Sequence, residues 1–227
     1  MDYTIRSAQQ PLGSPTSDWD NPLWDAADTL DINLYRWEDS GHHPHTQARV
    51  LYDDDFLAAI FRVEDRYVRA VSENFGDPVS QDSCVEFFLS PYSMEQTDAY
   101  FNFELSCGGT LLLRRCSSSA ERGWGRTSPL LAESDASLIR VAHSLPSRVE
   151  PEITEPTSWT VEFHVPFELF GRYFVDLPRP TTGTEWKGNL YKCAGASSHP
   201  HWGTWAPIHL AKPSFHAPAF FQPLHFS

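Results

Sequence analysis

The sequence predicts an all-β protein: an antiparallel β-sandwich of jelly-roll type, with about ten to eleven strands and one short helical turn. Three observations support this fold class. Short runs of alternating apolar and polar residues recur every 10 to 20 residues or so, which is typical of half-buried strands. Many of the 18 prolines and 12 glycines stand between these runs, where turns are required. The chain shows no long segment with the apolar spacing of an amphipathic helix.

Composition narrows the class of protein. With 41% hydrophobic and 14% aromatic residues in a chain of 227, there is enough apolar material for a large core. A formal charge of −13 argues against nucleic-acid binding, because phosphate contacts need clusters of Lys and Arg. No apolar run approaches the ~20 residues of a membrane helix, so we expect no membrane insertion. The start lacks the features of a signal peptide, which predicts a cytoplasmic protein unless a leader was removed.

The first elements follow from composition and aromatic content. Residues 1–18 are polar and contain Pro and Ser, so we expect an N-terminal arm followed by a single domain over residues 19–227. Trp19 and Trp24 precede a strand near residues 29–37 and are expected to pack as a plug at one end of the sandwich. Packing is the simplest role for such a pair.

The next two strands, at 47–52 and 56–64, are joined by the acidic turn 53–55. Its consecutive aspartates make calcium a possible ligand, but the EF-hand spacing is missing and a turn that begins a hairpin is the simpler interpretation. Two loops are rich in histidine, and together they would offer an all-imidazole metal site, although loop histidines are usually solvated. These histidines are His42, His43, His45, His199 and His201.

The strongest pattern lies in residues 84–89 and 100–107, where every second residue is apolar. Because side chains alternate between the two faces of a strand, a hairpin with its apolar residues on one face places Glu86, Asn102 and Glu104 on the other. A polar cluster on a rigid sheet is a candidate functional site.

The remaining elements are shorter. Further strands are expected at 110–116, 137–145, 158–165 and 185–193, and a helical turn at 166–171. A loop before residue 129 carries Trp124, which could form a ligand platform. The four cysteines show no CxxC spacing and are interpreted as reduced thiols, with a Cys107–Cys116 disulfide as the alternative.

Seven segments, in order, resemble the family 9 carbohydrate-binding modules and the related DOMON-like β-sandwiches. They span about residues 19 to 226, nearly the whole chain. Each is short, but their common order makes the resemblance fairly specific. The segments read NPLWDAADTLDINLY, TQARVLYDDDFLAAIFRVED, QDSCVEFFLSP, AYFNFELSCGGTL, SWTVEFHVPFELF, WKGNLYKCAG and HWGTWAPIHLAKPSFHAPAFFQPLHF.

The resemblance implies a β-sandwich without catalytic machinery that binds a sugar at a chain end between two tryptophans. The family's carboxylate corresponds to Glu86, the family's arginine falls at Asn102, and the family's amide side chain falls near Tyr191. Lys192 would flank the ligand, but it alternates with Tyr191, so only one of the two reaches the ligand from a regular strand.

The two tryptophan positions of the family are occupied by other residues. One falls at Pro78 and Val79 and the other at Phe215, beside which His216 is a further expected contact. Trp124 or Trp202 could replace a clamp residue from a loop.

The leading hypothesis is a non-catalytic carbohydrate-binding domain that recognises a sugar or glycan chain end and assists polysaccharide breakdown by a partner glycoside hydrolase. A structural or protein-partner-binding domain is the alternative. A second alternative is a glycoside hydrolase that uses Glu86 and Glu104, because that reaction needs two nearby carboxyl groups. A haem protein with Met94 as an axial ligand is a third.

Overall fold

The computed structural model describes residues 1–37, 39–92, 99–117 and 129–227. Met94 and Trp124, considered above, lie outside these residues. The described residues form fourteen strands, so the expected all-β class is confirmed. The strands are β1 (Tyr3–Ser7), β2 (Leu30–Asp31), β3 (His45–Tyr52), β4 (Phe56–Asp65), β5 (Val68–Ala70), β6 (Cys84–Ser90), β7 (Ala99–Ser106), β8 (Leu111–Ser117), β9 (Arg140–His143), β10 (Val149–Ile153), β11 (Thr157–Pro166), β12 (Glu185–Cys193), β13 (Trp202–Thr204) and β14 (Gln222–Phe226).

The number of strands exceeds the expected ten to eleven because β2, β5 and β13 contain only two or three residues each. Such short strands carry no readable alternation. The helical elements are brief, and α2 occupies the expected helical turn. They are η1 (Pro22–Ala26), η2 (Val79–Gln81), α1 (Glu133–Ala136), α2 (Phe167–Tyr173) and η4 (Pro218–Phe220).

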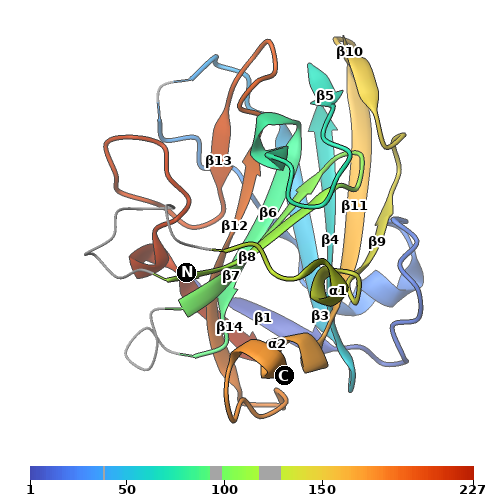
Figure 1. Ribbon diagram of the computed structural model, residues 1–227, viewed down its shortest axis with the longest axis vertical. Coiled ribbons are helices and arrows are strands. Elements are labelled where there is room, and N and C mark those ends of the chain that lie inside the picture. The colour runs from blue at the N-terminus through green and yellow to red at the C-terminus, as the bar shows by residue number, and fades with distance from the viewer. Residues whose placement is uncertain (38, 93–98, 118–128) are drawn as a thin grey trace.

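One large sheet curls into the two layers of a sandwich (Figure 1). Its strand order is β8-β7-β6-β12-β14-β1-β3-β4-β11-β9, with β13 paired to β12, β2 paired to β3, and a separate β10-β5 pair. The sheet is mixed rather than purely antiparallel, because β1 runs parallel to both β14 and β3. The first half of β1 pairs with β14 and the second half with β3, so this strand joins the two layers.

The segment expected as an N-terminal arm therefore contains a central strand. The end of this segment is attached to β11, because Glu162 Oε2 accepts hydrogen bonds from the backbone nitrogens of Thr16 (3.0 Å) and Ser17 (2.8 Å). Trp19 and Trp24 are buried in a small apolar cluster of their own, which agrees with their expected packing role.

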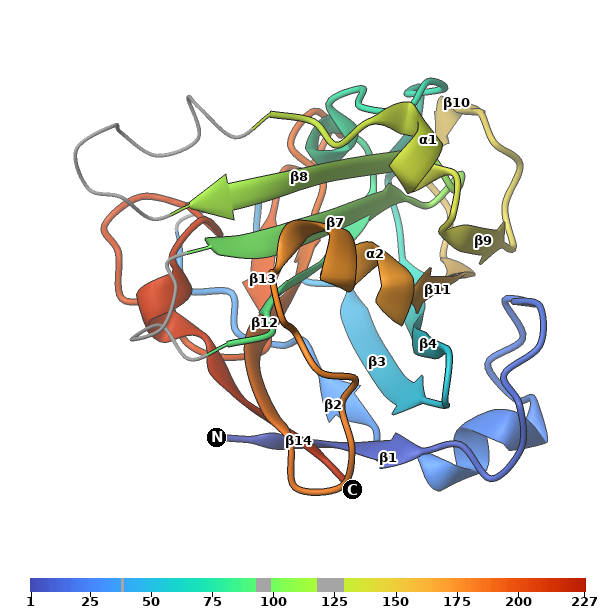
Figure 2. The same cartoon turned by 60° about the horizontal axis from the view of Figure 1, so that its bottom comes forward.

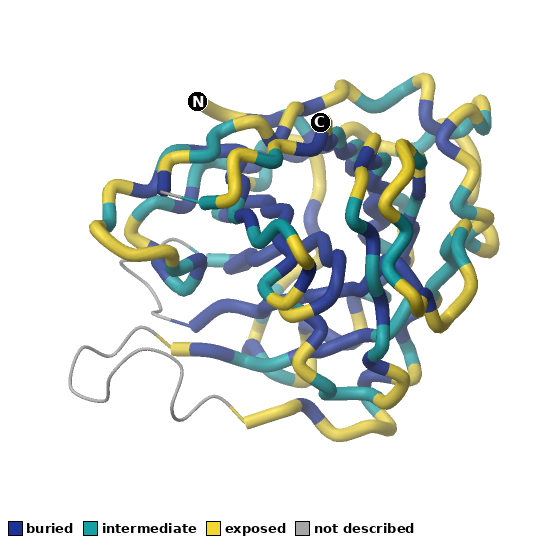
Figure 3. Tube along the Cα trace, turned by 90° about the horizontal axis from the view of Figure 1, so that it is seen from above, coloured by how far each residue is buried: buried dark blue, intermediate teal, exposed yellow. Residues whose placement is uncertain are grey.

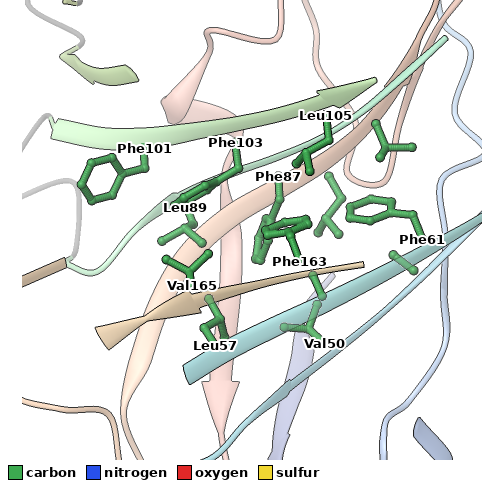
Figure 4. Packing of buried hydrophobic residues seen from close by; sticks show 14 of the residues in the cluster. Val50, Leu57, Phe61, Phe87, Leu89, Phe101, Phe103, Leu105, Phe163 and Val165 are labelled. Atoms are coloured by element: carbon green, nitrogen blue, oxygen red, sulfur yellow. The ribbon is translucent and has the colours of Figure 1, made fainter. Parts of the chain in front are cut away.

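The main core lies between the two layers, where side chains of β6 and β7 point toward those of β3, β4 and β11 (Figure 4). Phe103 stacks on Phe163, with ring centroids 5.9 Å apart, and Phe163 stacks on Phe61 at 6.3 Å. The strands are largely buried and the connecting loops are exposed (Figure 3). The alternation in 84–89 and 100–107 thus identifies the core face correctly.

Helix α2 covers one end of the space between the layers (Figure 2). Phe170 packs against Phe101 of β7 and Trp186 of β12, at centroid distances of 5.6 and 5.0 Å. No helix among the described residues has the length and hydropathy needed to cross a membrane. All four cysteines are buried free thiols, so the Cys107–Cys116 disulfide considered above is not formed.

Candidate functional site

The second face of the β8-β7-β6-β12 layer, directed away from the main core, carries the candidate site. Residues directly opposite each other in an antiparallel pair share a face, so the register decides which side chains meet. Glu86 of β6 stands between Glu104 of β7 and Tyr191 of β12. Next along the same face, Cys84 stands opposite Cys193, and Cys193 stands opposite Trp202 of β13.

This face is covered by the chain that returns after β13, residues 205–221. Asn189 attaches its beginning: the Asn189 amide donates to Ala206 O (3.1 Å), and Asn189 Oδ1 accepts from Ala206 N (3.0 Å). Farther on, Phe215 stacks on Tyr191 at a centroid distance of 4.2 Å and an angle of 9°, and the Tyr191 hydroxyl donates to Phe215 O (3.2 Å). Trp37 Nε1 donates to Leu210 O (2.9 Å).

A cavity of about 230 Å³ remains between the covering segment and the sheet. This volume lies below the ~300–1,000 Å³ of pockets for drug-sized ligands, so it suits one small ring rather than several. Glu86 and Glu104 reach it from the sheet, whereas Trp202 and Phe215 provide aromatic surface. The lining residues are Ser80, Glu86, Glu104, Cys193, Trp202, Pro213, Ser214, Phe215 and His216.

The polar groups of the cavity are held by short local hydrogen bonds. Asn102 Nδ2 donates to Glu104 Oε1 (2.7 Å), while Asn102 Oδ1 accepts from the backbone nitrogen of Arg114 (2.7 Å). Asn102 is fully buried, so it orients Glu104 and is not itself part of the cavity wall. Glu86 Oε1 accepts from the Cys193 thiol at 3.1 Å.

Burial changes the protonation of these groups. Burial and the neighbouring Glu104 raise the pKa of Glu86 well above its ordinary value. Burial also raises the pKa of Glu104 to about 7, against the opposing effects of the Asn102 hydrogen bond and the Arg114 charge. Burial, aided by Arg114, lowers the pKa of His216 to about 4. At neutral pH the site therefore contains a neutral His216 imidazole and two carboxyl groups that are more protonated than exposed glutamates are.

Tyr191 and Lys192 lie on opposite faces, as their alternation requires, and Tyr191 is on the cavity side. Lys192 points between the two layers and is fully buried. Its Nζ lies 2.8 Å from His201 Nε2, 3.0 Å from Cys193 O and 3.4 Å from Asp65 Oδ2. This corrects the expectation that Lys192 flanks the ligand: its charge is neutralised inside the sandwich.

The histidine loops do approach each other, but they use their ring nitrogens within the protein. His42 lies 5.2 Å from His201 between ring centroids, yet His42 Nε2 contacts Asp65 Oδ1 (2.8 Å). His201 Nε2 faces Lys192, an arrangement that a bound cation would disrupt. Among the described residues, no group of ligand atoms from these two loops is close enough to hold a metal ion.

The acidic turn 53–55 is a hairpin start. Asp53 Oδ1 accepts from the backbone nitrogens of Asp55 (2.8 Å) and Phe56 (2.7 Å), and its Oδ2 accepts from Leu12 N (2.9 Å). Both Asp53 oxygens are thus occupied by backbone donors, which favours the turn interpretation over calcium binding.

Several cavity residues are missing from the sequence prediction. Alternation could have identified Cys193, because it follows Tyr191 by two positions and therefore shares its face of the strand. Trp202 is one of two possible clamp replacements, and its position depends on β13, which is too short to predict. Ser80, Pro213 and Ser214 come from loops, where no periodicity exists to read.

The family model of carbohydrate-binding family 9 matches residues 24–226. The chain belongs to carbohydrate-binding family 9. The match covers both layers of the sandwich and every residue that lines the cavity. No significant match was found among curated proteins.

Three solved structures are similar over 100% of this family 9 chain. A proposed carbohydrate-binding protein from Bacteroides uniformis is 27% identical, with a TM-score of 0.86 and 99% of its chain covered. A family 9 module from Caldicellulosiruptor kristjanssonii in complex with cellotriose is 10% identical, with a TM-score of 0.62 and 93% covered. The same organism's module in complex with glucose is 11% identical, with a TM-score of 0.60 and 96% covered.

Proposed function

We propose that this family 9 domain binds the terminal sugar of a carbohydrate chain in the cavity between Trp202, Phe215 and the Glu86–Glu104 pair. The observation that carries the proposal is the placement of two carboxyl groups beside aromatic surface in a small cavity. The cavity volume favours one sugar unit, so the rest of a chain would extend outward. The cellotriose and glucose complexes of the Caldicellulosiruptor modules supply the ligand class.

The chemistry of a sugar ring matches these walls. Its axial C–H surface is apolar and packs on aromatic faces, while its equatorial hydroxyls need donors and acceptors at the edge. Trp202 and Phe215 meet the first need. Glu86, Glu104 and His216 meet the second, with Phe215 held in place by its stack on Tyr191.

The Glu86–Glu104 pair supports binding better than hydrolysis. Glycosidases place their two carboxyl groups on either side of the scissile bond. Glu86 and Glu104 are adjacent on neighbouring strands of one sheet, so both approach a ligand from the same side.

The test is a calorimetric titration of the metal-free protein with glucose, cellobiose and cellotriose. We expect binding of the intact sugars and at least tenfold weaker binding by Glu86→Ala. Glu185→Ala, an exposed glutamate on β12, is the matched control and should bind as the wild type does. Unchanged cellotriose affinity in a folded Glu86→Ala variant, or no binding by the wild type, would refute the proposal.

A further inference from the structure

Two cysteines and a glutamate converge at the floor of the cavity. Cys84 and Cys193 are directly opposite each other on β6 and β12, and Glu86 is the next residue of β6 on the same face. One ligand atom from each, the two sulfurs and a carboxylate oxygen, lie within 4.8 Å of one another. All three side chains are buried, with exposed fractions of 0%, 1% and 3% for Cys84, Cys193 and Glu86.

We propose that Cys84, Cys193 and Glu86 form a binding site for a thiophilic divalent cation, with zinc as the ion that fits best. This site is additional to the proposed carbohydrate binding, although the two share Glu86. It has no counterpart among the other described His, Cys, Asp and Glu residues.

The spacing suits tetrahedral zinc. With Zn–S bonds of ~2.3 Å, two sulfurs of a tetrahedral site are about 3.8 Å apart, and a sulfur and a carboxylate oxygen are slightly closer. The three ligand atoms already lie within 4.8 Å, and Cys193 Sγ is 3.1 Å from Glu86 Oε1. The pairing of β6 with β12 therefore already brings the three ligand atoms near the spacing that a tetrahedral ion requires.

The ligand types select the ion. Two thiolates with one carboxylate favour zinc over calcium or magnesium, which prefer oxygen ligands throughout. On binding, each thiol and the carboxyl group, if protonated, releases its proton to the solvent, and the ion takes their place. Cys193 and Glu86 line the cavity, so the fourth position of the ion would face it and accept a water molecule or a ligand hydroxyl.

The test uses the reduced, metal-free protein, with a non-chelating reductant in every sample so that both sulfurs remain thiols. Cobalt(II) is added first, because a thiolate-to-cobalt charge-transfer band reports sulfur ligation directly. Zinc is then titrated against a chromogenic chelator. We expect one equivalent of each ion to bind, and we expect Cys84→Ser and Cys193→Ser to lose the cobalt band and to bind zinc at least tenfold more weakly.

Two other buried cysteines provide matched controls. Cys107→Ser and Cys116→Ser should retain both the cobalt band and the zinc affinity. Glu86→Gln should also weaken zinc binding, and testing it beside the serine variants means that the result does not depend on the folding of any one variant. The absence of a charge-transfer band in the wild type would overturn the proposal. Bands in Cys84→Ser and Cys193→Ser that are as strong as the wild-type band would also overturn it. Cellotriose titration of the metal-free wild type tests the carbohydrate proposal separately, so the two can fail independently.

Discussion

Lys192 holds a positive charge inside the sandwich, and replacing it with methionine separates a structural role from a ligand-binding one. Methionine keeps much of the length and volume of the lysine side chain while removing its charge. The negative partner, Asp65, then loses its only fully buried cation among the described residues. Burial alone would raise the pKa of Asp65, but the Lys192 charge and the His42 hydrogen bond outweigh it and lower the pKa.

The expected cost follows from the remaining partners of Asp65. Removing one member of a buried ion pair typically costs ~3–5 kcal/mol. Asp65 retains hydrogen bonds from Arg66 N (2.8 Å), His42 Nε2 (2.8 Å) and Trp159 Nε1 (3.3 Å), which soften the loss. We therefore expect Lys192→Met to lower the free energy of unfolding by about 3 kcal/mol, at the lower end of that range.

Urea unfolding at pH 7.5 measures this cost, with cellotriose affinity measured at a temperature where the variant is folded. Lys187→Met is the matched control on the same strand, because its pair with Glu185 (3.0 Å) is partly exposed and worth at most ~1 kcal/mol. The double variant Lys192→Met/Asp65→Asn should recover part of the loss. A fully stable Lys192→Met protein with weakened cellotriose binding would refute the reasoning and return Lys192 to the ligand site.

Two further predictions concern stability. Burial and the adjacent Lys192 lower the pKa of His201 to about 3, below its unfolded value of 6.5. Below pH 6.5 the unfolded state therefore binds more protons than the folded state, and this residue lowers the free energy of unfolding by about 2 kcal/mol as the pH decreases from about 7.5 to 5. Urea unfolding across that range should show a smaller decrease in His201→Gln than in the wild type. An identical decrease in both proteins would contradict the assignment. A Cβ on Gly108 would lie 2.3 Å from Ser147 O, so Gly108→Ala should cost ~1–3 kcal/mol. Gly171→Ala, in α2 with open space around it, should be neutral or stabilising. Thermal unfolding of both variants measures the difference, and equal melting temperatures would argue against the close approach of Gly108 to Ser147.

The sequence predicts the layers of this fold better than their connection. Alternation identifies the core faces of β6 and β7, because a strand with one apolar face shows apolar residues at every second position, although both faces of these strands are buried. It gives no sign that Tyr3–Ser7 is the strand joining the layers. The parallel pairing of β1 depends on contacts with β14 and β3, at distant points of the chain, and five residues carry too little pattern to indicate it.

The sequence likewise predicts only some of the residues of the candidate site. Glu86 and Glu104 follow from alternation, and the opposite orientation of Tyr191 and Lys192 follows from the same rule. The role of Asn102 as a support for Glu104 depends on a side-chain hydrogen bond that spacing cannot reveal. The burial of the whole face depends on the covering segment 205–221, whose path is fixed by Asn189 and by the stack of Phe215 on Tyr191.

The location of the sugar is the central claim, and a crystal structure of the protein with cellotriose tests it most directly. We predict that a terminal glucose unit lies in the cavity, with its C–H face against Trp202 or Phe215, its hydroxyls hydrogen-bonded to Glu86 and Glu104, and the other units extending to solvent. Cellotriose bound at another surface, with the Glu86 cavity free of sugar, would contradict the account.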